Sequence, residues 1–186
     1  RSNGMSFWQS LPYAAGGSLM WEYAMENEPP SINDFFATTM GGVCLGEMTF
    51  RLSDLAIDDR ATGINRFARE FLVTLVSPSR GLNRIISGDA WRRRSIRGNS
   101  IGNFPIQGYT IIGARELVSI YGNNSHGDFS HSMYVDAGVF YGNMFDPDNE
   151  KPYDAFSLRL TANFFSEQPF LCNLNALGQL YSHPIS

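Results

Sequence analysis

Residues 29–51 read PPSINDFFATTMGGVCLGEMTFR, a stretch that joins a strong helix start to glycines in the helix interior. The two prolines cannot continue a preceding helix and favour an extended entry. Ser31 is then the predicted N-cap, and Asp34 follows three residues on, as in a capping box. Asp34 also suits the positive end of the helix dipole. The pattern predicts a helix from Ser31 to about Leu55.

A stripe of small side chains offers a reason for the glycines. Thr39, Gly42, Gly46, Thr49 and Ser53 follow one another at spacings of three and four, so they share one helix face. Each interior glycine costs about 1 kcal/mol relative to alanine, and close approach of a second backbone offsets that cost. We therefore expect a helix-packing surface here. The larger side chains, expected to fill the core, lie on another face: Phe36, Met40, Val43 and Phe50.

The same helix carries Glu47 and Arg51 four residues apart, in the favourable order for an ion pair. The favoured interpretation is a surface pair, because long charged side chains commonly reach outward to water. The alternative is a partly buried polar cluster that adds Glu22 and Asp34 to this pair.

The hydrophobic period changes from helical to alternating near residue 100. Before it, we expect three further helices, over residues 6–27, 63–77 and 81–87, the last of only one or two turns. A break at Gly16-Gly17, which would divide the first of them into two, is the alternative. Arg66 and Glu70 are spaced as an i,i+4 pair, and Pro78 ends their helix. Residues 89–107 read as a linker or an interface strip.

After that point, four strands are predicted over residues 108–121, 131–142, 153–166 and 169–182. Their apolar and polar side chains alternate, and turn-forming residues separate them. Each strand is long enough to span a bilayer when tilted, which favours the wall of an outer-membrane β-barrel. A soluble antiparallel sheet has the same alternation. Four strands cannot close a barrel, since about eight is the minimum, so the remaining strands are expected outside this chain.

The composition agrees with an envelope protein. Charged residues make up 17% and aromatic residues 13% of the 186 residues, with 18 glycines, as suits a membrane-embedded barrel. The net charge of −4 argues against a nucleic-acid partner. The fold class is therefore α+β: a helical subdomain over residues 1–100, then an antiparallel β-meander over residues 101–186.

Several spaced motifs resemble one bacterial family. They are RSNG, GSLMWEY, PPSIND, TTMGGVCLGEMTFRLSD and SRGLNRIISG, in this order along the first half of the chain. Together they resemble an uncharacterised domain-of-unknown-function family of envelope proteins, largely from Gram-negative bacteria. The resemblance implies a helical N-terminal part, an outer-membrane β-barrel and a chain that extends beyond both ends of this sequence. It implies no activity.

The sequence contains only weak indications of catalytic or metal-binding residues. Ser130 and His131, with His126 in the preceding loop, are the candidates for a lipid hydrolase with a serine–histidine pair. A turn is the simpler interpretation of this segment. The histidines lack metal-ligand spacing with cysteines or carboxylates, so we predict no metal and no cofactor.

A basic cluster with one tryptophan stands out in the linker: Trp91, Arg92, Arg93, Arg94 and Arg97. Tryptophan favours the headgroup level of a membrane, and arginines meet phosphates or acidic surfaces. We therefore consider two interpretations of equal weight: the cluster is an interfacial membrane anchor, or it is part of a solvated linker.

The leading functional hypothesis is an outer-membrane protein with a structural, pore or assembly role and no catalysis. Its partners are then outer-membrane lipid or other envelope proteins. The alternatives are a lipid-modifying or hydrolytic outer-membrane enzyme and a soluble α+β binding module.

Overall fold

The computed structural model describes residues 2–27, 29–93, 105–119, 128–147, 149, 151–164 and 171–181. The chain divides into two compact units, Arg1–Asn103 and Phe104–Ser186. The first is helical and the second is an antiparallel sheet, so the α+β prediction is confirmed.

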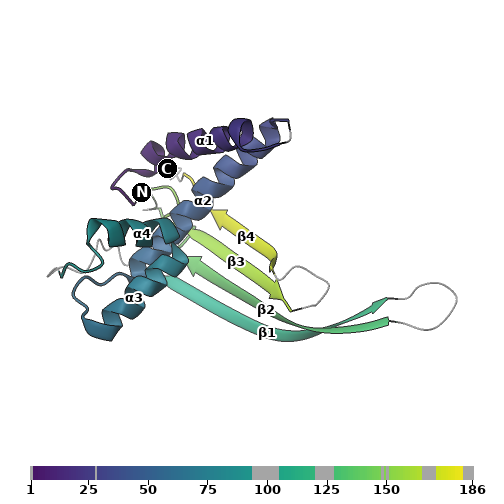
Figure 1. Ribbon diagram of the computed structural model, residues 1–186. Helices are drawn as coiled ribbons and strands as arrows, with labels where there is room; N and C mark the ends of the chain where they lie inside the picture. The colour runs from purple at the N-terminus through teal and green to yellow at the C-terminus, as the bar shows by residue number, and fades with distance from the viewer. Residues whose placement is uncertain are drawn as a thin grey trace. The chain divides into compact units, whose positions relative to one another are not determined.

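Four helices form the first unit: α1 (Phe7–Ala24), α2 (Ile32–Ala56), α3 (Gly63–Val76) and α4 (Pro78–Ser87). Each packs on the next in chain order (Figure 1). Helix α1 is continuous through the two glycines, so the predicted alternative of a break is wrong. A complete capping box fixes its start, because Ser6 and Gln9 bond each other's backbone amides. No helix in the described part of the chain is long and apolar enough to cross a membrane.

Helix α2 begins as the sequence predicts, and its cap is completed from another helix. The Asp34 amide donates to the Ser31 hydroxyl at 3.4 Å. The Ser31 amide donates to the carboxylate of Glu22 on α1, at 3.3 Å. Glu22 therefore makes the bond that a capping box assigns to the residue three positions after the cap. This ties the end of α1 to the start of α2.

The buried face of α2 agrees with the predicted faces at Val43, Thr39 and Ser53 and differs elsewhere. Its members recur mainly every four residues and include the charged pair: Thr39, Val43, Glu47, Met48, Arg51 and Ser53. Phe36 and Met40, expected in the core, are 55% and 48% exposed. The core-facing stripe of this helix is thus made largely of small and polar side chains.

Helix α4 begins at Pro78, three residues before its predicted start. Proline is pre-organised for the first helical position, and Ser77 before it is both the C-cap of α3 and the N-cap of α4. Gly88 closes the helix in the left-handed conformation, with φ of 79°.

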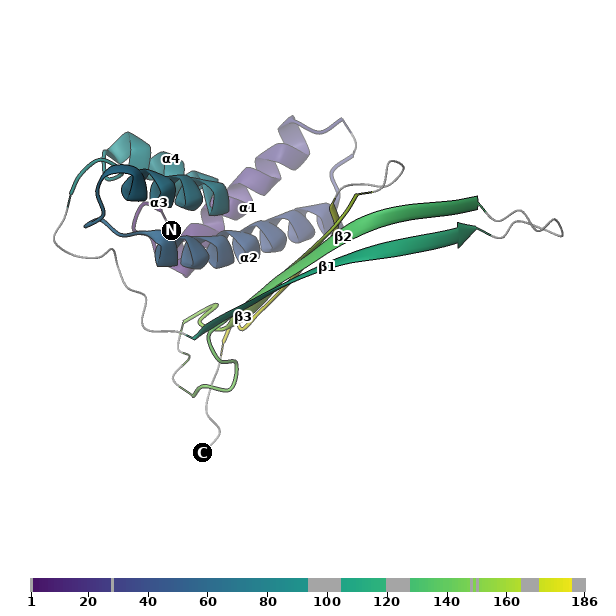
Figure 2. The ribbon, with the colours of Figure 1, turned by 90° about the horizontal axis from the view of Figure 1, so that it is seen from below.

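The second unit is one sheet in the order β1 (Ile106–Ser119), β2 (Asp128–Tyr141), β3 (Phe156–Asn163) and β4 (Leu171–Gly178). All neighbours are antiparallel, and an irregularity interrupts the register between β3 and β4 at Thr161 and Ala162. Strands β1 and β2 have 14 residues each and extend past the 8-residue β3 (Figure 2). At one end of the sheet, the rings of Tyr141 and Phe156 stack 4.8 Å apart.

Candidate functional site

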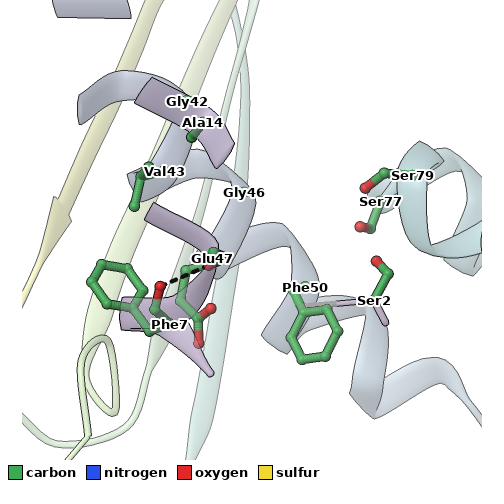
Figure 3. Close-up of a pocket in the computed structure, with 11 residues that line it drawn as sticks. Ser2, Phe7, Ala14, Gly42, Val43, Gly46, Glu47, Phe50, Ser77 and Ser79 are labelled. Atoms are coloured by element: carbon green, nitrogen blue, oxygen red, sulfur yellow. Dashed lines mark hydrogen bonds between the residues drawn. The ribbon is translucent and has the colours of Figure 1, made fainter. Parts of the chain in front are cut away.

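A cavity of about 180 Å³ lies among α1, α2 and the start of α4 in the helical unit. Four serine hydroxyls, one carboxylate and an apolar wall line this serine pocket. Its polar members are Ser2, Ser10, Ser77, Ser79 and Glu47, and its apolar wall includes Phe7, Val43 and Phe50. In Figure 3, Ser2, Ser77 and Ser79 lie together on one side of the pocket, and Phe7 lies with Glu47 on the other. No local sequence pattern indicates this pocket, because its residues come from four separate segments.

The ion pair that borders the serine pocket is buried. Arg51 Nε lies 3.0 Å from Glu47 Oε1, and both side chains are 1% exposed. The favoured interpretation of a surface pair is therefore wrong. The i,i+4 spacing correctly identified the partners, but spacing cannot tell which side of a helix the rest of the fold covers.

The four residues of the predicted polar cluster lie in two places. Glu22 is 5% exposed and bonds the start of α2, where Asp34 is exposed in the first turn. Glu47 lies 13 positions after Asp34 on the same helix, or about 20 Å at 1.5 Å per residue. The structure thus separates a capping group from the buried pair of Glu47 and Arg51.

The predicted glycine stripe is not closely packed. A Cβ atom added to Gly42 or Gly46 meets nothing within 4 Å, and both glycines border the serine pocket. Thr39 is buried, and Thr49 bonds the carbonyl of Leu45, one turn back on its own helix. The helices do pack on one another, but these two glycines face open space in the described structure.

A network of charged side chains, which the sequence did not reveal, joins α3 to α4. Arg84 reaches Asp59 at 2.6 Å and Glu70 at 2.8 Å, with all three side chains at most 16% exposed. Burial lowers the pKa of Arg84, and its hydrogen bonds to Glu70 and Asp59 more than offset this, so its pKa is raised. The predicted i,i+4 partner of Glu70, Arg66, instead donates to the backbone carbonyls of Asp89, Ala90 and Arg92.

Arg66 holds the turn that carries Trp91 beside α3. Trp91 is 71% exposed and borders an apolar groove with Phe67, Phe71 and Ile85. Arg92 and Arg93 follow it and are exposed. The two other members of the predicted interfacial cluster, Arg94 and Arg97, lie outside the described residues.

Reversing the charge of Arg92 and Arg93 together should reduce binding of the full chain to anionic phospholipid vesicles, because clustered basic residues are attracted to anionic headgroups. Co-sedimentation at low and high salt measures this. Arg60→Glu is the control, because Arg60 is exposed, belongs to the same unit and lies outside the turn. Equal binding by the wild type and the double variant would reject the anchor hypothesis.

One face of the sheet carries a polar network centred on Asp136. Arg159 donates to both of its carboxylate oxygens, with Nε at 2.9 Å and 3.1 Å from them. Tyr109 and Thr161 donate to the same carboxylate at 3.2 Å and 3.3 Å. The hydrogen bonds from Arg159 lower the pKa of Asp136 despite its burial. This face also carries apolar side chains: Ile111, Phe140 and Leu177.

Two glycines on the polar face make room for tyrosines of the neighbouring strand. Tyr134 lies directly opposite Gly113, and a Cβ added there falls 2.6 Å from the tyrosine Cζ. Tyr109 covers Gly138 in the same way, with its Cζ 2.6 Å from the added Cβ. Such aromatic–glycine pairs fix the register of neighbouring strands.

The opposite face of the sheet is apolar between its ends. Register pairs place on it Ile112, Ala114, Met133, Val135, Ala137, Val139, Leu158, Leu160, Ala162, Leu174 and Ala176. Several are well exposed, with Ile112 at 68% and Leu160 at 39%. On β1 this face carries Ile106, Gly108, Thr110, Ile112 and Ala114. Glu116 and His131, which face each other 3.9 Å apart, end it.

The candidate catalytic residues do not form a described site. His131 is exposed and pairs with Glu116, His126 lies outside the described residues, and nothing of the Ser130 side chain is described. Within the described ranges, no group of three or more histidines, cysteines or carboxylates could hold a metal ion.

Comparison with known proteins adds one match. Residues 1–79 match the model of a family described as Domain of unknown function (DUF3943). Every residue that lines the serine pocket lies within this range. No curated protein and no solved structure matches the chain. The resemblance to an uncharacterised domain-of-unknown-function family is therefore confirmed over residues 1–79.

Proposed function

We propose that the β unit is part of the wall of an outer-membrane β-barrel, in an envelope protein with a structural, pore or assembly role. The observation that carries the proposal is the contrast between the two faces of the sheet. One face bears the Asp136–Arg159 network and asparagines, as suits a polar lumen, and the other bears apolar side chains between its ends. Strands in a barrel wall alternate in this way.

The length of the apolar face supports the same proposal. It covers nine residues of β1, from Ile106 to Ala114, with the small polar Thr110 at the middle, before the charged Glu116. A tilted membrane-spanning strand needs about 9–11 residues. Charged groups avoid the hydrocarbon layer, so a Glu116–His131 pair suits the boundary with the headgroups.

Closure of the barrel requires strands beyond the four described. About eight strands are the minimum, and a sheet open at β1 and β4 presents unpaired backbone groups that hydrocarbon cannot satisfy. The proposed partners are therefore outer-membrane lipid and further strands, from the same protein or from another envelope protein.

Probes on the two faces of the sheet test the proposal. Leu160→Cys and Asn175→Cys place single thiols on opposite faces of neighbouring strands, after Cys44 and Cys172 are replaced by alanine. Each is labelled with an environment-sensitive fluorophore, and the full chain is reconstituted into vesicles that contain nitroxide-labelled phospholipid. We expect strong quenching at position 160 and little at position 175, because only the apolar face meets acyl chains.

The contrary outcome is equally specific. If the apolar face packs against protein in a soluble module, the label at position 160 is shielded from water but is not quenched by lipid-borne nitroxide. A chain that stays folded and monomeric without detergent would also reject the membrane proposal.

A further inference from the structure

Ser77 is a buried serine with an unused hydroxyl at the start of a helix. It is the N-cap of α4 and is 3% exposed, yet its side chain makes no capping bond. Among the described residues, its hydroxyl has no hydrogen-bond partner. An N-cap serine ordinarily bonds its own helix. Ser77 borders the serine pocket instead, so the pocket is where this hydroxyl can find a partner.

Further hydrogen-bond donors gather beside Ser77. Ser79, at the second position of α4, contributes a hydroxyl, and its backbone amide has no acceptor among the described residues. Ser2 contributes a third hydroxyl on the same side of the pocket (Figure 3). Its backbone carbonyl accepts a hydrogen bond from Asn83 at 2.8 Å, which holds Ser2 against α4.

The electrostatic field at this end of the pocket favours negative charge. Helix α4 has ten residues, and the unpaired amides at a helix N-terminus carry the positive end of its dipole. The guanidinium of Arg80, in the same first turn, lies 4.1 Å from the ring centre of Phe50, which borders the pocket, and its charge is paired with Asp54. Glu47 also borders the pocket, but Arg51 balances its charge at 3.0 Å.

We propose that the serine pocket binds a phosphate-type oxyanion, held by the hydroxyls of Ser2, Ser77 and Ser79 and by the N-terminus of α4. The volume of about 180 Å³ is room for about six water molecules at 30 Å³ each, or for one tetrahedral oxyanion. The oxyanion is a free phosphate or the phosphate of a lipid headgroup, which present the same chemistry to these donors.

Titration of the full chain with inorganic phosphate, in a phosphate-free detergent, tests this site. The ³¹P resonance of the phosphate reports its binding. Ser77→Ala should weaken binding about tenfold, the effect of one hydrogen bond to a charged group. Its fold should persist, because the hydroxyl makes no capping bond. Ser79→Asp should abolish binding while preserving α4, because a carboxylate suits the first turn but repels an anion. Ser87→Ala, at the other end of α4, is the matched control and should bind as the wild type does.

A second arm distinguishes the two sources of the oxyanion. If short-chain phosphatidylglycerol displaces inorganic phosphate from the wild type, the natural ligand is a lipid headgroup. Displacement by glycerol phosphate but not by the lipid identifies a soluble ligand, and either result supports the site. Absence of phosphate binding by the wild type, or equal binding by the wild type, Ser77→Ala and Ser79→Asp, overturns the proposal.

Discussion

Replacing Glu47 with glutamine should lower the free energy of unfolding by about 3–5 kcal/mol. The substitution keeps the shape of the side chain but removes its charge, so Arg51 loses its ion pair with Glu47. Both side chains are 1% exposed, so bulk water has little access to the broken contact. Urea unfolding of the full chain, followed by circular dichroism, measures the change.

Removal of both charges distinguishes two quantities: the loss of stability when one partner is removed, and the net contribution of the ion pair to stability. The double variant Glu47→Met/Arg51→Met should recover most of the stability, because apolar side chains of similar volume often replace a buried pair at little cost. Asp58→Asn is the control, because the Asp58–Arg60 pair lies at the surface, with Arg60 55% exposed. A Glu47→Gln variant as stable as the wild type would show that this pair is hydrated in solution.

Local sequence signals identified the elements well, because their physical causes are local. Ser31 could be recognised as the cap of α2 from the residues beside it, and the alternation over residues 156–163 identified β3. The contribution of Glu22 to the α2 cap could not be predicted in this way. It depends on how α1 folds back on α2, which no spacing within either helix encodes.

Burial was the main property that local patterns did not reveal. The buried face of α2 contains Glu47 and Arg51, whereas the large side chains of Phe36 and Met40 are exposed. Hydrophobicity rules assign these faces the other way round. The serine pocket was missed for a related reason, because its hydroxyls meet only through tertiary contacts between segments as distant as Ser2 and Ser79.

Gly81→Ala should destabilise the helical unit by about 1–3 kcal/mol, the usual cost of forcing atoms into a packed site. Gly81 is buried where α4 crosses α3, and an added Cβ falls 2.6 Å from the Cα of Thr74. A backbone atom cannot turn aside, so α4 must move away from α3 and strain the hydrogen bonds between Arg84 and Glu70. Thermal and urea unfolding of the full chain measure the loss.

Gly46→Ala is the matched comparison and should raise, rather than lower, the free energy of unfolding. An added Cβ at Gly46 meets nothing within 4 Å, so the intrinsic preference of helices for alanine should stabilise α2 by up to about 1 kcal/mol. The two glycines look alike in sequence, since both lie in helix interiors. If Gly46→Ala were the more damaging change, another backbone would have to lie on the Gly42–Gly46 face in the assembled protein. The pair of substitutions therefore decides whether this face of α2 is an open border of the serine pocket or a packing surface for a further chain.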